Sequence, residues 1–147
     1  MIIKSYELNK IDINKKKLFL LYGHNEGLKN EVTKKYFVNK FKGNIFRYDE
    51  KEVIDNNSDF FDGILSRSFF EEKKLFIVSR VTDKLNNIIE EILEKEVKDV
   101  VIVLNASILD KKSKLRKFFE KNKDIVCIPV YEDNFQTLST IARDFFK

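Results

Sequence analysis

The chain has 147 residues, a length that predicts one domain with its own hydrophobic core. A net charge of +4 with 43% hydrophobic residues fits a soluble globular protein and is too mild to demand a nucleic-acid partner. Its single cysteine excludes a disulfide framework and a cysteine zinc site, and no apolar run suits a signal peptide or a membrane span, so we expect a cytoplasmic protein.

The first dozen residues predict a short strand and a helical turn. Five short apolar segments then predict strands, namely Leu18–Tyr22, Asn44–Tyr48, Leu75–Ser79, Val100–Leu104 and Ile125–Tyr131. Three of them are nearly continuous apolar runs, which is typical of strands buried on both faces of a parallel sheet. Cys127 lies in the last segment, so we interpret it as a buried small apolar side chain and not as a reactive thiol.

Segments with helical spacing of apolar residues alternate with these strands. They cover residues 28–41, 59–65, 83–95, 110–121 and 133–146. Asp110 and Asp133 are the predicted N-caps of the last two. The alternation predicts an α/β fold, a three-layer sandwich around a five-stranded parallel sheet, with residues 1–147 as a single domain.

The turn after the first core strand is the natural ligand site of such a fold, and here it reads LLYGHNEGLKNEV. A phosphate loop requires G-x-x-x-x-G-K-[ST], in which the lysine reaches the phosphates and the hydroxyl holds magnesium. Gly23 and Gly27 are separated by three residues, Leu28 follows the second glycine, Lys29 comes one place late, and Asn30 replaces the hydroxyl. We therefore interpret the glycines as a tight turn that starts a helix, and the loop as a degenerate phosphate loop without a bound cofactor.

The acidic partner of a phosphate loop is missing as well. A magnesium-holding carboxylate is expected at the end of a central strand, but the best candidate strand ends with Asn105 and Ala106, and Asp99 lies at its other end. His24 is the only histidine, and the sequence shows no carboxylate and nucleophile that would complete a catalytic group with it. We therefore expect it to be a solvent-facing loop residue. The sequence predicts no catalytic residue and no metal site.

Two adjacent phenylalanines occupy the turn between the helix that ends near Leu65 and the strand that starts at Leu75. Turns at such places normally carry polar residues. Phe69 and Phe70 either pack under the sheet edge or protrude as an anchor for a partner. From the residues alone, packing is the preferred interpretation, because apolar residues near the ends of elements are common.

Four segments in this order resemble the N-terminal domain of the delta subunit of the bacterial DNA polymerase III clamp loader, over essentially the whole chain. They are LFLLYGHNEGLKNEV, SRSFFEEKKLFIVSR, VVIVLNASILDKKSKLRKFFEK and NFQTLSTIARDFFK. The resemblance implies an AAA+-like fold of the P-loop NTPase type that has no ATPase activity of its own. It also implies that the domain binds the sliding clamp and helps to open it.

In that family a hydrophobic plug before the third core strand enters a pocket of the clamp. The resemblance places the plug at Phe69 and Phe70, with Ser68 and Leu65 on the same stretch, and it reverses the preference for packing. Some family members have glutamine where this chain has Leu65, so the polar part of that contact is not carried over.

The basic residues Arg67, Lys73 and Lys74 are candidates for steering the domain toward an acidic clamp surface. Family chains continue into a helical lid and a collar that joins the other loader subunits, and primed DNA passes close by. This chain stops at Lys147, so we expect an excised domain that is monomeric and has no membrane contact.

Two alternatives stay open. One is a divergent P-loop NTPase. The other is a DNA-binding module that uses the basic residues at the start of the helix over 110–121, which are Lys111, Lys112, Lys114, Arg116 and Lys117.

Overall fold

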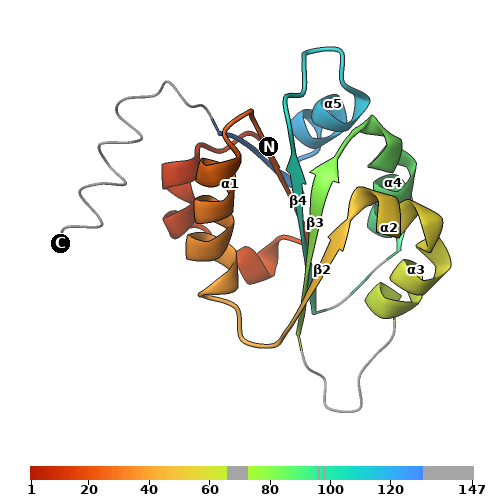
Figure 1. The fold of residues 1–147 in the computed structure, drawn as a ribbon. Coiled ribbons are helices and arrows are strands. Elements are labelled where there is room, and N and C mark those ends of the chain that lie inside the picture. The colour runs from red at the N-terminus through yellow and green to blue at the C-terminus, as the bar shows by residue number, and fades with distance from the viewer. Residues whose placement is uncertain (66–72, 96, 98, 131–147) are drawn as a thin grey trace.

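The structure, a computed structural model, describes residues 1–65, 73–95, 97 and 99–130 (Figure 1). Five parallel strands form one sheet in the order β2-β3-β4-β1-β5. Their bounds are Leu18–Tyr22 for β1, Asn44–Asp49 for β2, Lys74–Val81 for β3, Val100–Ala106 for β4 and Val126–Pro129 for β5. The predicted α/β class with a five-stranded parallel sheet is confirmed.

The helices flank both faces of this sheet (Figure 1). One layer contains the 3₁₀ helices η1 (Ser5–Lys10) and η2 (Ile13–Lys15), helix α1 (Glu26–Thr33) and the π-helical turn η3 (Lys34–Val38) that continues it. The opposite layer contains α2 (Glu50–Asp55), α3 (Asn57–Leu65), the short 3₁₀ helix η4 (Asp83–Leu85), α4 (Asn86–Glu94) and α5 (Lys114–Lys121). The predicted helices over 28–41, 59–65, 83–95 and 110–121 correspond to α1 with η3, α3, η4 with α4, and α5.

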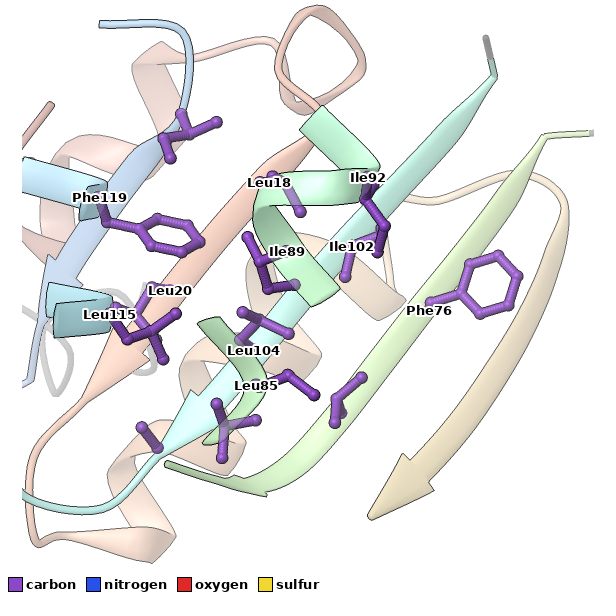
Figure 2. Close-up of a cluster of buried hydrophobic side chains, with 14 of the residues drawn as sticks. Leu18, Leu20, Phe76, Leu85, Ile89, Ile92, Ile102, Leu104, Leu115 and Phe119 are labelled. Atoms are coloured by element: carbon purple, nitrogen blue, oxygen red, sulfur yellow. The ribbon is translucent and has the colours of Figure 1, made fainter. Parts of the chain in front are cut away.

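The two faces of the central strands explain why their sequences are apolar throughout. Along β1, Leu18 and Leu20 face the layer of α2 to α5, whereas Phe19 and Leu21 face the layer of α1. Figure 2 shows the first cluster, in which Leu85, Ile89 and Ile92 lie over the strands. Side chains on alternate positions of a strand enter opposite layers, so a strand covered on both faces needs an apolar residue at every position.

Three details differ from the predictions. Asp110 is not the N-cap of α5, because Ser113 takes that place and its Oγ accepts a hydrogen bond of 3.2 Å from the Arg116 N–H. Asp110 instead accepts a bond from the Lys112 N–H inside the preceding turn. Helix α2 was not predicted, and β5 is shorter than the segment predicted for it. The predicted helix over 133–146, with its cap Asp133, lies outside the described residues.

The N-terminal segment extends the sheet beyond β5. Ile2 forms a parallel bridge with Cys127, through hydrogen bonds from the Ile3 N–H to the Cys127 carbonyl and from the Cys127 N–H to the Met1 carbonyl. The predicted strand and helical turn over the first dozen residues therefore appear as this bridge and η1. Within the part of the chain that the structure describes, no helix is long and apolar enough to cross a membrane.

Cys127 is fully buried, as predicted, and burial raises the pKa of its thiol to about 12, with the nearby Glu120 carboxylate adding to the rise. At pH 8 only about one thiol in ten thousand is then ionised, and the thiolate is the reactive form. We expect iodoacetamide to leave the native protein unmodified at pH 8 for hours and to alkylate it stoichiometrically in 6 M guanidinium. Mass spectrometry of the intact protein measures both results, and rapid native labelling would contradict the burial.

Candidate functional site

The loop after β1 is held tightly between the ends of two neighbouring strands. Gly23 has φ 142°, and a Cβ at this position would lie 2.0 Å from the carbonyl oxygen of Val130. The Gly23 N–H donates to the carbonyl of Ser107, which follows β4, and the Val130 N–H donates to the carbonyl of Tyr22. Backbone packing therefore explains the glycine without a bound phosphate.

The same loop starts α1 in an ordinary way. Asn25 is the N-cap, and its side-chain oxygen accepts a hydrogen bond of 3.0 Å from the Leu28 N–H. Gly27 lies in the first turn of the helix, and His24 is exposed. Both observations agree with the prediction of a tight turn that starts a helix and of a solvent-facing histidine.

Lys29, the late lysine of the degenerate loop, is the most informative residue of this site. Its side chain is only 1% exposed, and its ammonium group lies at the end of β4. Its Nζ donates to the carbonyl of Ala106 at 2.6 Å and to Glu26 Oε1 at 2.5 Å. The ammonium group is thus bound by the protein's own carbonyl and carboxylate, where a working phosphate loop would direct a lysine to a nucleotide.

The end of β4 next to Lys29 carries an amide in place of a carboxylate. Asn105 is buried, and its Oδ1 accepts a hydrogen bond of 3.3 Å from the hydroxyl of Thr33, which also donates to the carbonyl of Lys29. Asp99 lies at the other end of β4, as the sequence predicted. The described residues include no group of three His, Cys, Asp or Glu side chains that could hold a metal ion.

Two acidic residues that sequence reasoning did not single out lie near the carboxyl end of β3. Glu50 is buried and accepts hydrogen bonds from the N–H and the hydroxyl of Thr82, at 2.8 and 2.9 Å. Asp83 accepts from Ser113 Oγ at 2.5 Å and from the N–H groups of Leu115 and Lys114. Both carboxylates join secondary-structure elements to one another. Each follows a predicted strand directly or nearly so, and this position in the sequence could have marked both residues as candidates.

The contacts of Asp83 also affect its ionisation. Partial burial opposes the charged form, but the hydrogen bonds from Ser113, Leu115 and Lys114, together with the charge of Lys114, lower the pKa of Asp83 below its usual value. Asp83 is therefore an anion at neutral pH that stabilises the N-terminus of α5.

The segment predicted to bind a clamp links α3 to β3 in the sequence, and β3 starts at the amino-terminal end of the sheet. Phe69, Phe70, Ser68 and Arg67 lie outside the described residues. Leu65, the last residue of α3, is 42% exposed, and Lys73 is exposed. Lys74 is buried, and its Nζ donates to the carbonyl of Gly63 at 2.9 Å, so its ammonium group is engaged in joining β3 to α3.

An aromatic cluster joins β2, β3 and α3. Phe76 is buried and stacks on Phe46 with a centroid distance of 5.0 Å, and Phe60 meets it edge to face at 5.8 Å. Tyr48 contacts both Phe60 and Phe76. These contacts fix the two elements from which the turn departs.

The basic start of α5 is less available than its sequence suggests. Arg116 donates from Nε to Glu120 at 2.7 Å and from Nη1 to the carbonyl of Leu109 at 2.9 Å, and its guanidinium group lies 5.0 Å from the ring centre of Tyr22. The exposed cations that remain there are Lys111, Lys112, Lys114 and Lys117. Arg116 is thus a structural residue of the loop region and not a contact offered to a partner.

The chain was also compared with known proteins. No protein-family model matches it. No curated protein matches it either.

Proposed function

We propose that this chain is a non-catalytic, AAA+-like clamp-loader domain that binds the sliding clamp of a bacterial replication machinery and helps to open it, in the cytoplasm and without a cofactor. The proposal that the domain is non-catalytic is based on the buried Lys29. Its ammonium group donates hydrogen bonds to the Ala106 carbonyl and the Glu26 carboxylate. The clamp-binding part rests on the resemblance of the segment SRSFFEEKKLFIVSR to the delta-subunit family.

The strand order distinguishes this sheet from the two common doubly wound folds. In the two common doubly wound folds the first strand lies beside the third or the fourth, in orders 2-1-3-4-5 and 3-2-1-4-5-6. Here β4 lies between β1 and β3, so the sheet has neither of these two orders. The degenerate phosphate loop follows β1 in the place where such folds bind a nucleotide.

The residues that flank the α3–β3 turn support a protein-binding role. Strand β3 starts after the turn, at the end of the sheet opposite the loop that follows β1, and the exposed Leu65 lies directly before the turn. At about 25 cal/mol per Å² of apolar area, burying two phenylalanine rings contributes a few kcal/mol. An anchor of this strength suits a contact that must form and dissociate in each loading cycle.

The two alternatives have less support. An NTPase would need a cation for the phosphates and a carboxylate for magnesium, but Lys29, Glu50 and Asp83 are engaged within the protein. A DNA-binding module at α5 could not use Arg116, the one arginine of that helix, because its guanidinium group donates hydrogen bonds to Glu120 and to the Leu109 carbonyl. Four exposed lysines are left for nonspecific phosphate contacts.

The decisive experiment is direct binding of this domain to the sliding clamp encoded by the same genome, measured by calorimetry. We expect a 1:1 complex of the domain with one clamp protomer, a dissociation constant of about 0.1 to 10 μM, and no ATP requirement. ATP hydrolysis should equal the buffer blank with magnesium present. Absence of a complex at 100 μM would refute the clamp assignment, and magnesium-dependent hydrolysis would refute the non-catalytic one.

A further inference from the structure

A small cavity lies at the end of the sheet where the strands begin, which is the lower end in Figure 1. It has a volume of about 100 Å³, well above what one water molecule needs. Lys15, Lys17 and Lys73 line it, and Phe41 and Val101 form part of its apolar wall. All of its lining residues belong to the described part of the chain. The cavity is separate from the loop after β1, which lies at the other end of that strand.

The cavity lies where the hydrogen bonding between β1 and β4 stops. The first bond of this ladder runs from the Ile102 N–H to the Lys17 carbonyl. One step nearer the start of the strands, a regular parallel ladder would join the Val100 N–H to the Lys15 carbonyl and the Lys17 N–H to the Val100 carbonyl. Neither bond forms within the described residues, because the chain before β1 turns into the 3₁₀ helix η2. The two segments separate there, and residues of both line the cavity.

Two backbone donors therefore face the space between these segments. Backbone groups alternate in direction along a strand, so the Val100 N–H points to the same side as that of Ile102, toward β1. By the same alternation the Lys17 N–H points toward β4. In the described part of the chain neither N–H has a hydrogen-bond acceptor, although Val100 is buried. Converging backbone N–H groups of this kind are a common element of anion-binding sites.

The charges around the cavity also favour an anion. Three lysines line it against one carboxylate, that of Asp99. Within the described residues, the ammonium groups of Lys15, Lys17 and Lys73 form no ion pair and no hydrogen bond. All three side chains are exposed, and a lysine stem is long and flexible enough to bring its ammonium group onto an anion bound between the strands.

We infer that this cavity binds the phosphate group of a small phosphate monoester. The phosphate oxygens accept hydrogen bonds from the N–H groups of Val100 and Lys17, and the lysines neutralise their charge. Phe41 supplies an apolar surface for the organic part of the ligand. A terminal phosphate suits the site better than a phosphodiester, because three of its oxygens are free to enter between the strands, where Val100 is buried.

The test is a titration of the ¹⁵N-labelled chain with phenyl phosphate at pH 7.5 and 50 mM salt, followed by the amide signals in two-dimensional NMR. We expect the Val100 and Lys17 amides to shift downfield and to saturate with a dissociation constant of about 1 to 10 mM. Inorganic phosphate should shift the same amides and bind about two- to fivefold more weakly, because it lacks the contact with Phe41. This arm needs no substitution, so it does not depend on the folding of a variant.

Charge variants test the lysines and the aspartate. Lys17→Gln/Lys73→Gln should weaken phenyl phosphate binding at least about tenfold, because two charged donors are lost. The matched control Lys111→Gln/Lys112→Gln removes two exposed lysines that follow β4, at the other end of the sheet, and should stay within about twofold of the parent. Asp99→Asn should strengthen binding about two- to fivefold, and asparagine tolerates the left-handed φ of 61° at this position.

Four outcomes overturn the inference. Shifts that do not saturate, or that spread over the exposed lysines and leave the Val100 amide unchanged, would mean nonspecific attraction of anions. Equal weakening by the two double variants would assign the effect to net charge. Weaker binding by Asp99→Asn would mean that the site does not select an anion. A single-stranded 20-nucleotide DNA that saturates the same amides at lower concentration than phenyl phosphate would reassign the cavity to nucleic acid.

Discussion

Replacing Phe69 and Phe70 together with alanine is expected to weaken clamp binding at least about 100-fold while leaving the domain about as stable as the parent. Buried aromatic anchors at the centre of an interface typically contribute 2 kcal/mol or more each, and both rings would be lost. The affinity is measured by calorimetry and the stability by urea denaturation. A matched control is Ile108→Ala, which removes a side chain that is 69% exposed at the opposite edge of the sheet and should change neither quantity.

The same pair of measurements separates the plug from the packing interpretation. If the rings belong to the core, each truncation lowers the free energy of unfolding by about 3 to 5 kcal/mol. Single variants then assign each ring, since adjacent side chains point in different directions. A destabilised double variant that still binds the clamp with the parent's affinity would refute the plug.

The sheet could be predicted because its signal is local and redundant. The runs LFLLY and VVIVL have no polar position, and only a strand covered on both faces requires that pattern. The class then follows from the alternation of these runs with helical spacing. The strand order could not be predicted in this way, because no local pattern states that β4 pairs with β1 and β3.

The missed details share one physical cause, which is that hydrogen bonds across distant segments decide them. Asp110 and Ser113 are both good N-cap residues, and the choice of Ser113 is stabilised by Asp83, 30 residues earlier, which accepts a bond from its hydroxyl. Helix α2 has only six residues, and its first residue, Glu50, is held by Thr82 after β3. Neither partner is visible from the local sequence.

The tight turn that starts α1 could be predicted from Gly23 and Gly27, because glycines between a strand and a helix are a local signal. The burial of Lys29 could not, because a lysine in a first helical turn is ordinarily exposed. One signal was present: Leu28, Val32 and Thr33 define the buried face of α1, and Lys29 lies four residues before Thr33 on that face. The spacing of three from Glu26 places the two charges together.

Replacing Lys29 with methionine is expected to lower the free energy of unfolding by about 1 to 2 kcal/mol, because the Ala106 carbonyl loses its donor at 2.6 Å. Methionine keeps the apolar stem, so the core stays filled. Lys29→Ala removes the stem as well and should lower the same free energy by about 2 to 4 kcal/mol. Urea denaturation at pH 7 measures both, with the exposed Lys34→Met in the continuing helical turn as a control that should stay within about 0.5 kcal/mol of the parent.

The result tests whether the loop after β1 can bind a nucleotide. If Lys29→Met is clearly destabilised and neither variant binds ATP in calorimetry, the ammonium group serves the fold, joining α1 to the end of β4 in the place of a ligand. If Lys29→Met is as stable as the parent, the bonds to Ala106 and Glu26 contribute nothing net, as holds for some buried charges. ATP binding gained by either variant would mean that Lys29 blocks a competent site, and the degenerate loop would then be an inhibited one.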